Sequence, residues 1–281
     1  MASISALNIY PVKSCAAIDL RQATLGRAGL ESGGVGDREW MVVEAGSGQF
    51  LTQREDARMA LITPATVAGS LILHAPGMPA LAVALDEFSL RSATLAVRVW
   101  NHACRAFDEG DGAATWLSDY LGRKLRLARF DPAHRRLSNR EWTQNAEAHN
   151  RFSDGYPILM VSQASLADLN DRLLLAGREA LPMNRFRPNI VLGDTGPFDE
   201  DRLLSLSGAD FSLKPVKPCP RCPIPSIDQA NGTRGADPLD ILAQYRNDPR
   251  LGVVFGQNTI IARGFGAVLA VGQSLDEEWS F

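Results

Sequence analysis

The 281-residue sequence predicts a mainly β fold with some α-helix, arranged as two β-rich units that pack together. Short segments in which apolar and polar residues alternate recur along the chain, and turns that contain Gly or Pro separate them. Two stretches have the spacing of apolar residues that is typical of a helix. A long polar segment, residues 131–155, lies between the two sets of strands, and we interpret it as a loop that crosses from one unit to the other.

Strands dominate the prediction for the first unit. The opening segment, SISALNIYPV, is short and rich in residues that favour strands. Hairpins are expected where Gly and Pro interrupt an apolar run, over residues 38–54 and again over residues 70–85. Residues 94–107 continue the pattern, because Leu95 and Val97 alternate with polar neighbours.

A helix over residues 111–121 is predicted to end this unit, because Ala114, Leu117 and Leu121 fall on one helical face. A strand over residues 124–130 follows directly. The expected domains are 1–125 and 126–281.

The second unit is predicted to contain one amphipathic helix among further strands. The helix covers residues 163–177, with Ser162 in position to cap its start and Gly177 near its end. Strands are expected over residues 156–162, 189–193, 203–216 and 259–271.

Composition excludes several classes of function. The formal net charge of −3 gives no reason to expect a nucleic-acid or membrane-surface partner. The start of the chain lacks the basic and apolar segments of a signal peptide, and no apolar run approaches the roughly 20 residues of a membrane helix. Four scattered cysteines are too few for a disulfide framework in a chain of this length, so we expect a cytoplasmic protein.

The segment KPVKPCPRCPIPSID, residues 214–228, places Cys219 and Cys222 three positions apart. A zinc site needs four ligands, and the remaining Cys and His residues show no ligand spacing. A redox dithiol needs its first cysteine at a helix N-terminus, whereas Pro223 and Pro225 favour a stiff extended segment. Two interpretations of the segment stay open. Its cysteines are buried packing residues, or one of them is a thiolate that binds a soft metal. Arg221 beside Cys222 favours the thiolate.

Three other segments are suited to binding an anion. Lys13 and Ser14 follow the first strand, Arg38 closes a glycine-rich run, and Arg187 and Asn189 open a later strand. Each of these alone is as well explained by a solvated surface side chain. No nucleotide-binding fingerprint is present, because no G-x-G-x-x-G lies between a strand and a helix.

Taken in order, several segments resemble the MOSC family, and within it the YcbX-like bacterial proteins and the mitochondrial amidoxime reducing component. They are YPVKSC, GDREWMVV, LTQRED, FSDGYPILMVSQASLADLN, NRFRPNIV, CPRC with SID, and FGQN. The resemblance implies an N-terminal MOSC-type β-barrel domain packed on a β-barrel MOSC domain. It also implies a molybdenum cofactor, which is a pterin dithiolene with a terminal phosphate, and it makes Cys222 the thiolate that binds the metal. Cys219 also has a counterpart in the family but is not the ligand.

The resemblance extends to further site residues. Those expected near the phosphate and pterin are Lys13, Ser14, Arg38, Arg187 and Asn189. Those expected near the metal are Asp154, Gly155 and Tyr156, and Pro220, Arg221 and Asn258 are further residues expected to contact the cofactor. Asp154 is the one carboxylate of the SDGYP motif, and we expect it to act as a proton donor or as an orienting group.

The implied activity is reduction of N-hydroxylated compounds, namely hydroxylamines, amidoximes and N-hydroxylated bases. The chain lacks the spaced cysteines of an iron–sulfur domain, so we expect electrons from a separate protein of the ferredoxin or flavin reductase type. PIPSID replaces the threonine-rich run that many relatives carry after the ligand, which leaves the substrate range open. The alternative is a protein that carries molybdenum cofactor or sulfur without turnover, in which Cys222 bears a persulfide.

Overall fold

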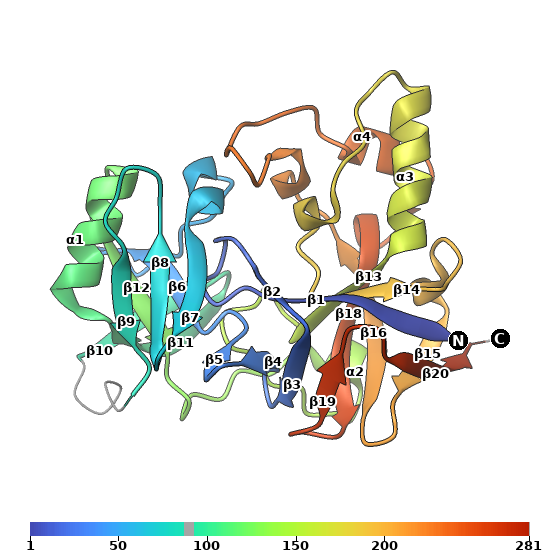
Figure 1. Ribbon diagram of the computed structural model, residues 1–281, viewed down its shortest axis with the longest axis horizontal. Coiled ribbons are helices and arrows are strands. Elements are labelled where there is room, and N and C mark those ends of the chain that lie inside the picture. The colour runs from blue at the N-terminus through green and yellow to red at the C-terminus, as the bar shows by residue number, and fades with distance from the viewer. Residues whose placement is uncertain (87–92, 281) are drawn as a thin grey trace.

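The computed structural model describes residues 1–86 and 93–280. Within them, strands of the second half of the chain form a closed barrel together with the first strand of the chain (Figure 1). In ring order its strands are β13 (Ile158–Ser162), β14 (Ile190–Gly193), β1 (Ala2–Ile9), β20 (Ser274–Trp279), β15 (Leu203–Ser207), β16 (Ser212–Pro220) and β18 (Gly252–Arg263). β18 pairs back with β13 and closes the ring. The β13–β14 pair is parallel and the other pairs are antiparallel.

The strands between residues 40 and 130 form an open half-barrel with a three-stranded meander beside it. Its main sheet has the order β10 (Thr94–Val99), β11 (His102–Asp108), β12 (Leu125–Phe130) and β6 (Trp40–Glu44). The meander consists of β7 (Thr63–Val67), β8 (Ser70–His74) and β9 (Leu81–Ala84). The expected hairpin over residues 70–85 is therefore confirmed, as the β8–β9 pair.

A small sheet contains strands from both ends of the chain. It has the order β19 (Val268–Ala270), β3 (Gln22–Gly26), β4 (Gly29–Ser32) and β5 (Val35–Gly36). Two further short strands, β2 (Ile18–Leu20) and β17 (Asn247–Asp248), pair with β1 and β18. The boundary expected near residue 125 stays a prediction, and the pairings of β1 with β14 and of β3 with β19 cross it.

The expected helices are present. α1 (Gly110–Leu121) ends at Gly122, which adopts the left-handed backbone that favours glycine. α3 (Gln163–Leu175) begins as expected, because the Ser162 side chain accepts a hydrogen bond from the Ser165 amide. Two one-turn helices, α2 (Arg140–Thr143) and α4 (Leu239–Leu242), complete the α-helices of the described residues. The fold prediction, mainly β with some α, is confirmed.

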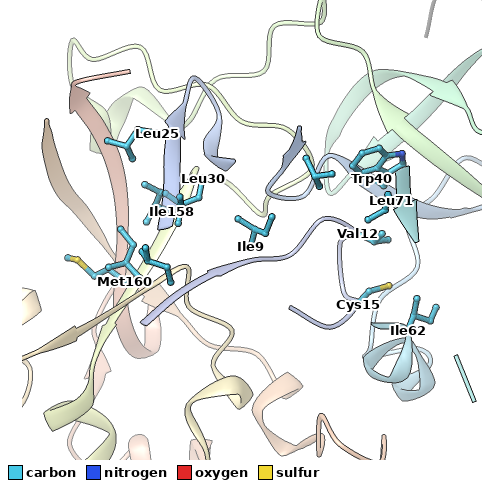
Figure 2. Close-up of a cluster of buried hydrophobic side chains, with 14 of the residues drawn as sticks. Ile9, Val12, Cys15, Leu25, Leu30, Trp40, Ile62, Leu71, Ile158 and Met160 are labelled. Atoms are coloured by element: carbon cyan, nitrogen blue, oxygen red, sulfur yellow. The ribbon is translucent and has the colours of Figure 1, made fainter. Parts of the chain in front are cut away.

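One large apolar cluster joins the barrel to the half-barrel, so that the two units share a core. Figure 2 shows part of it, with Ile9, Leu25, Leu30, Ile158 and Met160 toward the barrel and Val12, Cys15, Trp40, Ile62 and Leu71 toward the half-barrel. Burial raises the pKa of the Cys15 thiol to about 12, which makes this cysteine an apolar packing residue. Among the described residues, no helix is both long and apolar enough to cross a membrane.

Candidate cofactor site

All of the predicted site residues line one cavity of about 130 Å³, which we call the cofactor cavity. These residues are Lys13, Ser14, Arg38, Asp154, Gly155, Tyr156, Arg187, Asn189, Pro220, Arg221, Cys222 and Asn258. A larger hollow of about 730 Å³ lies between β1, β2 and α3, and none of the predicted residues lines it. The convergence of loops that are far apart in sequence, and not cavity size, therefore identifies the site.

Three of the lining residues have a strained backbone. Ser14, Arg38 and Arg187 have φ values of 67°, 47° and 58°, in the left-handed region that non-glycine residues rarely adopt. The surrounding chain holds Arg38 in this conformation, since the Arg38 amide donates to the Tyr10 carbonyl at 2.7 Å. Strain of this kind costs on the order of 1–3 kcal/mol per residue and gathers at functional sites.

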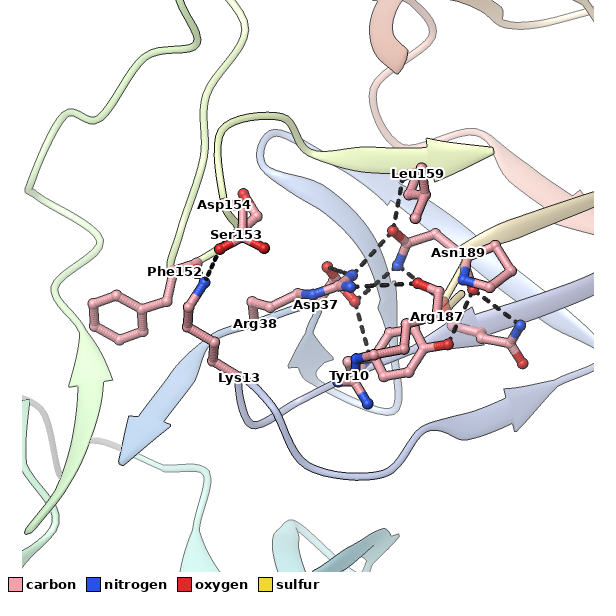
Figure 3. Close-up of polar contacts among 12 residues, drawn as sticks. Tyr10, Lys13, Asp37, Arg38, Phe152, Ser153, Asp154, Leu159, Arg187 and Asn189 are labelled. Carbon is pink, nitrogen blue, oxygen red and sulfur yellow. Dashed lines mark hydrogen bonds and ion pairs between the residues drawn. The ribbon is translucent and has the colours of Figure 1, made fainter. Parts of the chain in front are cut away.

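Arg38 belongs to a largely buried network of hydrogen bonds (Figure 3). Its Nη1 donates to an oxygen of Asp37 at 2.6 Å and to Oδ1 of Asn189 at 3.0 Å. Asp37, which is 1% exposed, also accepts hydrogen bonds from the Tyr10 amide and from Nδ2 of Asn189, both at 2.8 Å. Burial alone would lower the pKa of Arg38, but the Asp37 carboxylate outweighs it and the net shift is upward. Arg38 is therefore a structural cation at the cavity wall.

Arg187 is also buried but lacks such partners. Its Cζ lies 4.3 Å from the centroid of the Tyr10 ring, and Nη1 reaches Oε1 of Gln229 at the long distance of 3.4 Å. Nη2 is buried with no hydrogen-bond partner among the described residues. Desolvation lowers the pKa of Arg187, because the neighbouring groups, Tyr10 foremost, compensate for its burial only in part. A cation in this position is suited to an anionic ligand in the cavity.

Lys13 and Asp154 form an ion pair at another wall of the cavity (Figure 3). Nζ of Lys13 donates to Oδ1 of Asp154 at 2.7 Å and to the Phe152 carbonyl at 2.8 Å. Oδ1 also accepts a hydrogen bond from Nε1 of Trp100 at 3.0 Å. Desolvation alone would raise the pKa of Asp154, but Lys13 and Trp100 outweigh it and the net shift is downward, although 75% of the side chain stays exposed to solvent. Asp154 is therefore ionised at neutral pH, which favours the orienting role over the proton-donating one.

Arg136 holds the backbone of the loop that carries Asp154, although nothing in the sequence singled it out. Its Nη1 donates to the carbonyls of Arg151 and Ser153 at 2.7 and 2.8 Å. Burial lowers the pKa of Arg136, and its side chain is fixed among carbonyl oxygens beneath the loop. The segment around it, predicted as a loop, contains the one-turn helix α2 and a bridge between Leu137 and His149.

The two cysteines of the CPRC motif differ in position. β16 continues to Pro220, so Cys219 lies in a strand, while Cys222 follows the strand, and both cysteines line the cavity. Both carry free thiols. Nη1 of Arg221 contacts Sγ of Cys219 at 3.3 Å, so the contact expected between Arg221 and Cys222 is made with the other sulfur instead. The reason is that the chain turns after Pro220, where Nη2 of Arg221 binds the Phe186 carbonyl at 3.0 Å.

The donor set suits one soft metal ligand combined with an anion. Within residues 1–86 and 93–280, no three His, Cys, Asp or Glu side chains gather as metal ligands. Residues of the cavity that sequence reasoning did not name as site residues include Thr52 and Arg54. Both lie in the LTQRED segment, which was used for the resemblance but not examined residue by residue.

Comparison with known proteins agrees with this arrangement. Residues 1–124 match the MOSC N-terminal beta barrel domain and residues 147–276 match the MOSC domain. The chain is 33% identical to mitochondrial amidoxime reducing component 2 of Rattus norvegicus, over 88% of this chain and 73% of the relative. It is 30% identical to the human mitochondrial amidoxime-reducing component 1, over 94% and 78% of the two chains. Molybdenum cofactor sulfurase of Bos taurus matches at 30% identity over 86% of this chain but only 29% of that protein.

Proposed function

The chain belongs to the MOSC family, and from this membership we propose that it is a molybdenum-cofactor-dependent reductase of N-hydroxylated compounds. The substrates are hydroxylamines, amidoximes and N-hydroxylated bases. One observation carries the proposal: a single cavity contains the free thiol of Cys222 and, from a separate loop, the buried and unpaired guanidinium of Arg187. This pairing suits a ligand that has both a thiophilic metal and an anionic group.

The residues present fit the cofactor. The unpartnered Nη2 of Arg187 is the donor that a phosphate oxygen would satisfy, and the Ser14 hydroxyl lines the same cavity. Tyr156 has a buried hydroxyl that also lacks a partner among the described residues. Cys222 would bind the metal, since a thiolate is a soft ligand. Arg38 would fix the cavity wall, because its own charge is already satisfied by Asp37.

When bound, the cofactor supplies the two-electron chemistry that breaks the N–O bond, and the chain's own residues control protons and position. Conversion of R–NH–OH to R–NH₂ and water consumes two electrons and two protons. Lys13 bears a proton at the cavity wall, and burial lowers its pKa, which makes the proton easier to release. Asp154, held ionised, would orient the substrate N–OH group through its carboxylate. Both roles are proposals, as are the other site assignments.

The electrons come, in this proposal, from a separate protein of the ferredoxin or flavin reductase type in the cytoplasm. The alternative, a carrier of cofactor or sulfur, is favoured by the similarity to molybdenum cofactor sulfurase. The two functions differ in turnover, so an artificial electron donor is enough to distinguish them.

The test is to purify the protein from cells that make the cofactor, to measure molybdenum per chain, and to follow benzamidoxime reduction by reduced methyl viologen. About one molybdenum atom per chain with conversion to benzamidine is the expected result. Bound molybdenum without turnover would favour the carrier. Protein with far less than one molybdenum atom per chain and no pterin fluorescence would refute the reductase and the cofactor carrier and would leave only the sulfur carrier.

A further inference from the structure

A second hollow opens beside the cofactor cavity, and Arg54 lines both. It has a volume of about 710 Å³, and we call it the Trp100 groove. Its walls include Phe50, Leu51, Arg54, Glu55, Trp100 and Arg123. Because the groove adjoins the cavity where the N–O bond would be broken, it lies where the rest of a substrate molecule would extend.

Trp100 is held in this groove by an unusual backbone. Val99 and His102 pair across β10 and β11, so Trp100 and Asn101 form a two-residue hairpin loop. Trp100 has a φ of 55°, a conformation for which glycine is the usual residue in such loops. A bulky aromatic residue in a position that favours glycine is strained, and its side chain is directed by the turn instead of by core packing.

Three contacts fix the indole of Trp100. Nε1 donates to Oδ1 of Asp154 at 3.0 Å, and the Phe50 ring meets the indole edge-on with centroids 5.1 Å apart. Cζ of Arg54 lies 4.6 Å from the ring centroid and covers one face. Despite these contacts, Trp100 is 43% exposed, although it is a large apolar residue. A fixed aromatic surface is therefore open to the groove.

From this geometry we infer that Trp100 is a stacking platform for planar aromatic N-hydroxylated substrates and that it determines specificity for them. The role of Trp100 in substrate specificity rests on the proposed reductase function. The binding of a planar aromatic ligand to Trp100 does not. The aromatic part of the substrate stacks on the exposed part of the indole, as bases stack on aromatic side chains in nucleic-acid-binding proteins. The indole N–H donates a hydrogen bond to Asp154, so the position of the stacking platform is fixed relative to the carboxylate that orients the N–OH group. Small aliphatic substrates reach Asp154 without using the platform.

The experiment compares benzamidoxime with acetamidoxime, which has the same reactive group but a methyl in place of the phenyl ring. The cofactor-loaded full-length protein is assayed as wild type, Trp100→Gly and Trp100→Phe. Glycine adopts a φ of 55° without steric strain, so Trp100→Gly removes the platform and introduces no backbone strain. Trp100→Phe keeps an aromatic face but loses the hydrogen bond to Asp154. Trp279→Phe is the control, because this tryptophan also lies under an arginine, Arg202, and lines neither hollow.

We expect Trp100→Gly to raise the KM for benzamidoxime about tenfold and that for acetamidoxime less than twofold, in keeping with the energy of one aromatic stacking contact. Trp100→Phe should retain most of the preference for benzamidoxime. Equal losses on both substrates would show that Trp100 acts only through Asp154, and unchanged KM values would show no contact with substrate. Either result overturns the inference.

A second measurement separates this inference from the proposed function. If the wild-type protein reduces neither substrate, the reductase proposal fails, and binding of benzamidoxime is then measured by calorimetry without turnover. Wild-type binding that is weakened about tenfold by Trp100→Gly would still support the platform. Equal affinity of the two proteins, or no binding to either, would overturn it.

Discussion

Arg38 and Arg187 both pack against the Tyr10 ring, with Cζ 4.4 and 4.3 Å from its centroid, yet their replacement by methionine should have different effects on stability. Arg38→Met removes the cation that faces the Asp37 carboxylate, which is 1% exposed. Arg187→Met removes a buried cation with no carboxylate partner. Methionine retains much of the length of either side chain, so the two changes differ mainly in charge.

The difference can be estimated from the contacts. Breaking a buried ion pair by removing one partner costs roughly 3–5 kcal/mol. Asp37 keeps two neutral donors, Tyr10 N and Asn189 Nδ2, so we expect the lower end, about 3 kcal/mol, for Arg38→Met. Arg187→Met loses a cation–π contact of about 1–2 kcal/mol but relieves the desolvation of an unpaired charge of similar size. Its net effect on the cofactor-free protein should stay within about 1 kcal/mol.

The assay is urea denaturation of cofactor-free protein from cells that cannot make the cofactor, with molybdenum content measured separately for protein from cells that can. Arg38→Met should lower the free energy of unfolding by about 3 kcal/mol and Arg187→Met should change it by no more than about 1 kcal/mol. Both variants should bind less molybdenum than wild type. Arg202→Met, at an exposed arginine paired with Asp199, is the control and should change stability by about 0.5 kcal/mol or less. If Arg187→Met destabilises the protein as much as Arg38→Met does, Arg187 is a structural cation and the phosphate assignment loses its support.

Three further outcomes are expected. Cys222→Ala should abolish molybdenum binding and reductase activity while Cys219→Ala retains much of both, and equal losses would indicate a dithiol site. Because the folded-state pKa of Asp154 is depressed, its pairing with Lys13 stabilises the fold above about pH 4 and is lost as the pH falls further. Urea denaturation between pH 2 and 5 should therefore show a shallower loss of stability for Asp154→Asn than for wild type. Arg136→Met should destabilise the protein by about 2 kcal/mol and speed hydrogen exchange of residues 151–156, because the carbonyls of Arg151 and Ser153 lose their donor. Unchanged exchange would contradict the role given to Arg136.

Local sequence patterns predicted the secondary structure more reliably than they predicted its pairing. The α3 helix was predictable because its cap, Ser162, and its apolar spacing are both encoded within a few residues. β1 was predictable as a strand but was placed with the first unit, whereas it pairs with β14 and β20 of the barrel. Alternation of apolar residues specifies that a strand has a buried face, but the neighbouring strand is set by closure of the chain over long distances.

The site residues were predictable as a set because motifs carry residue identity, but their individual roles were not. Arg136 lies in a polar segment whose local sequence does not show whether an arginine is buried or exposed to solvent. Its burial depends on carbonyls 15 and 17 residues further along the chain. The contact of Arg221 with Cys219 instead of Cys222 depends on the direction of the backbone after Pro220, which residue type does not reveal.

The structure supports the site by a route that does not use the family resemblance. Of the eight non-glycine residues with positive φ in the described part of the chain, Ser14, Arg38 and Arg187 line the cofactor cavity, and Trp100 is bonded to Asp154 at its edge. They come from four separate loops, so a single local distortion cannot account for all of them. Non-glycine residues keep a strained positive φ only where the surrounding fold holds them in it, and such residues concentrate at ligand-binding sites. Because the unpaired charge of Arg187 lies in the same cavity, backbone strain and electrostatics independently select the place that the motifs select.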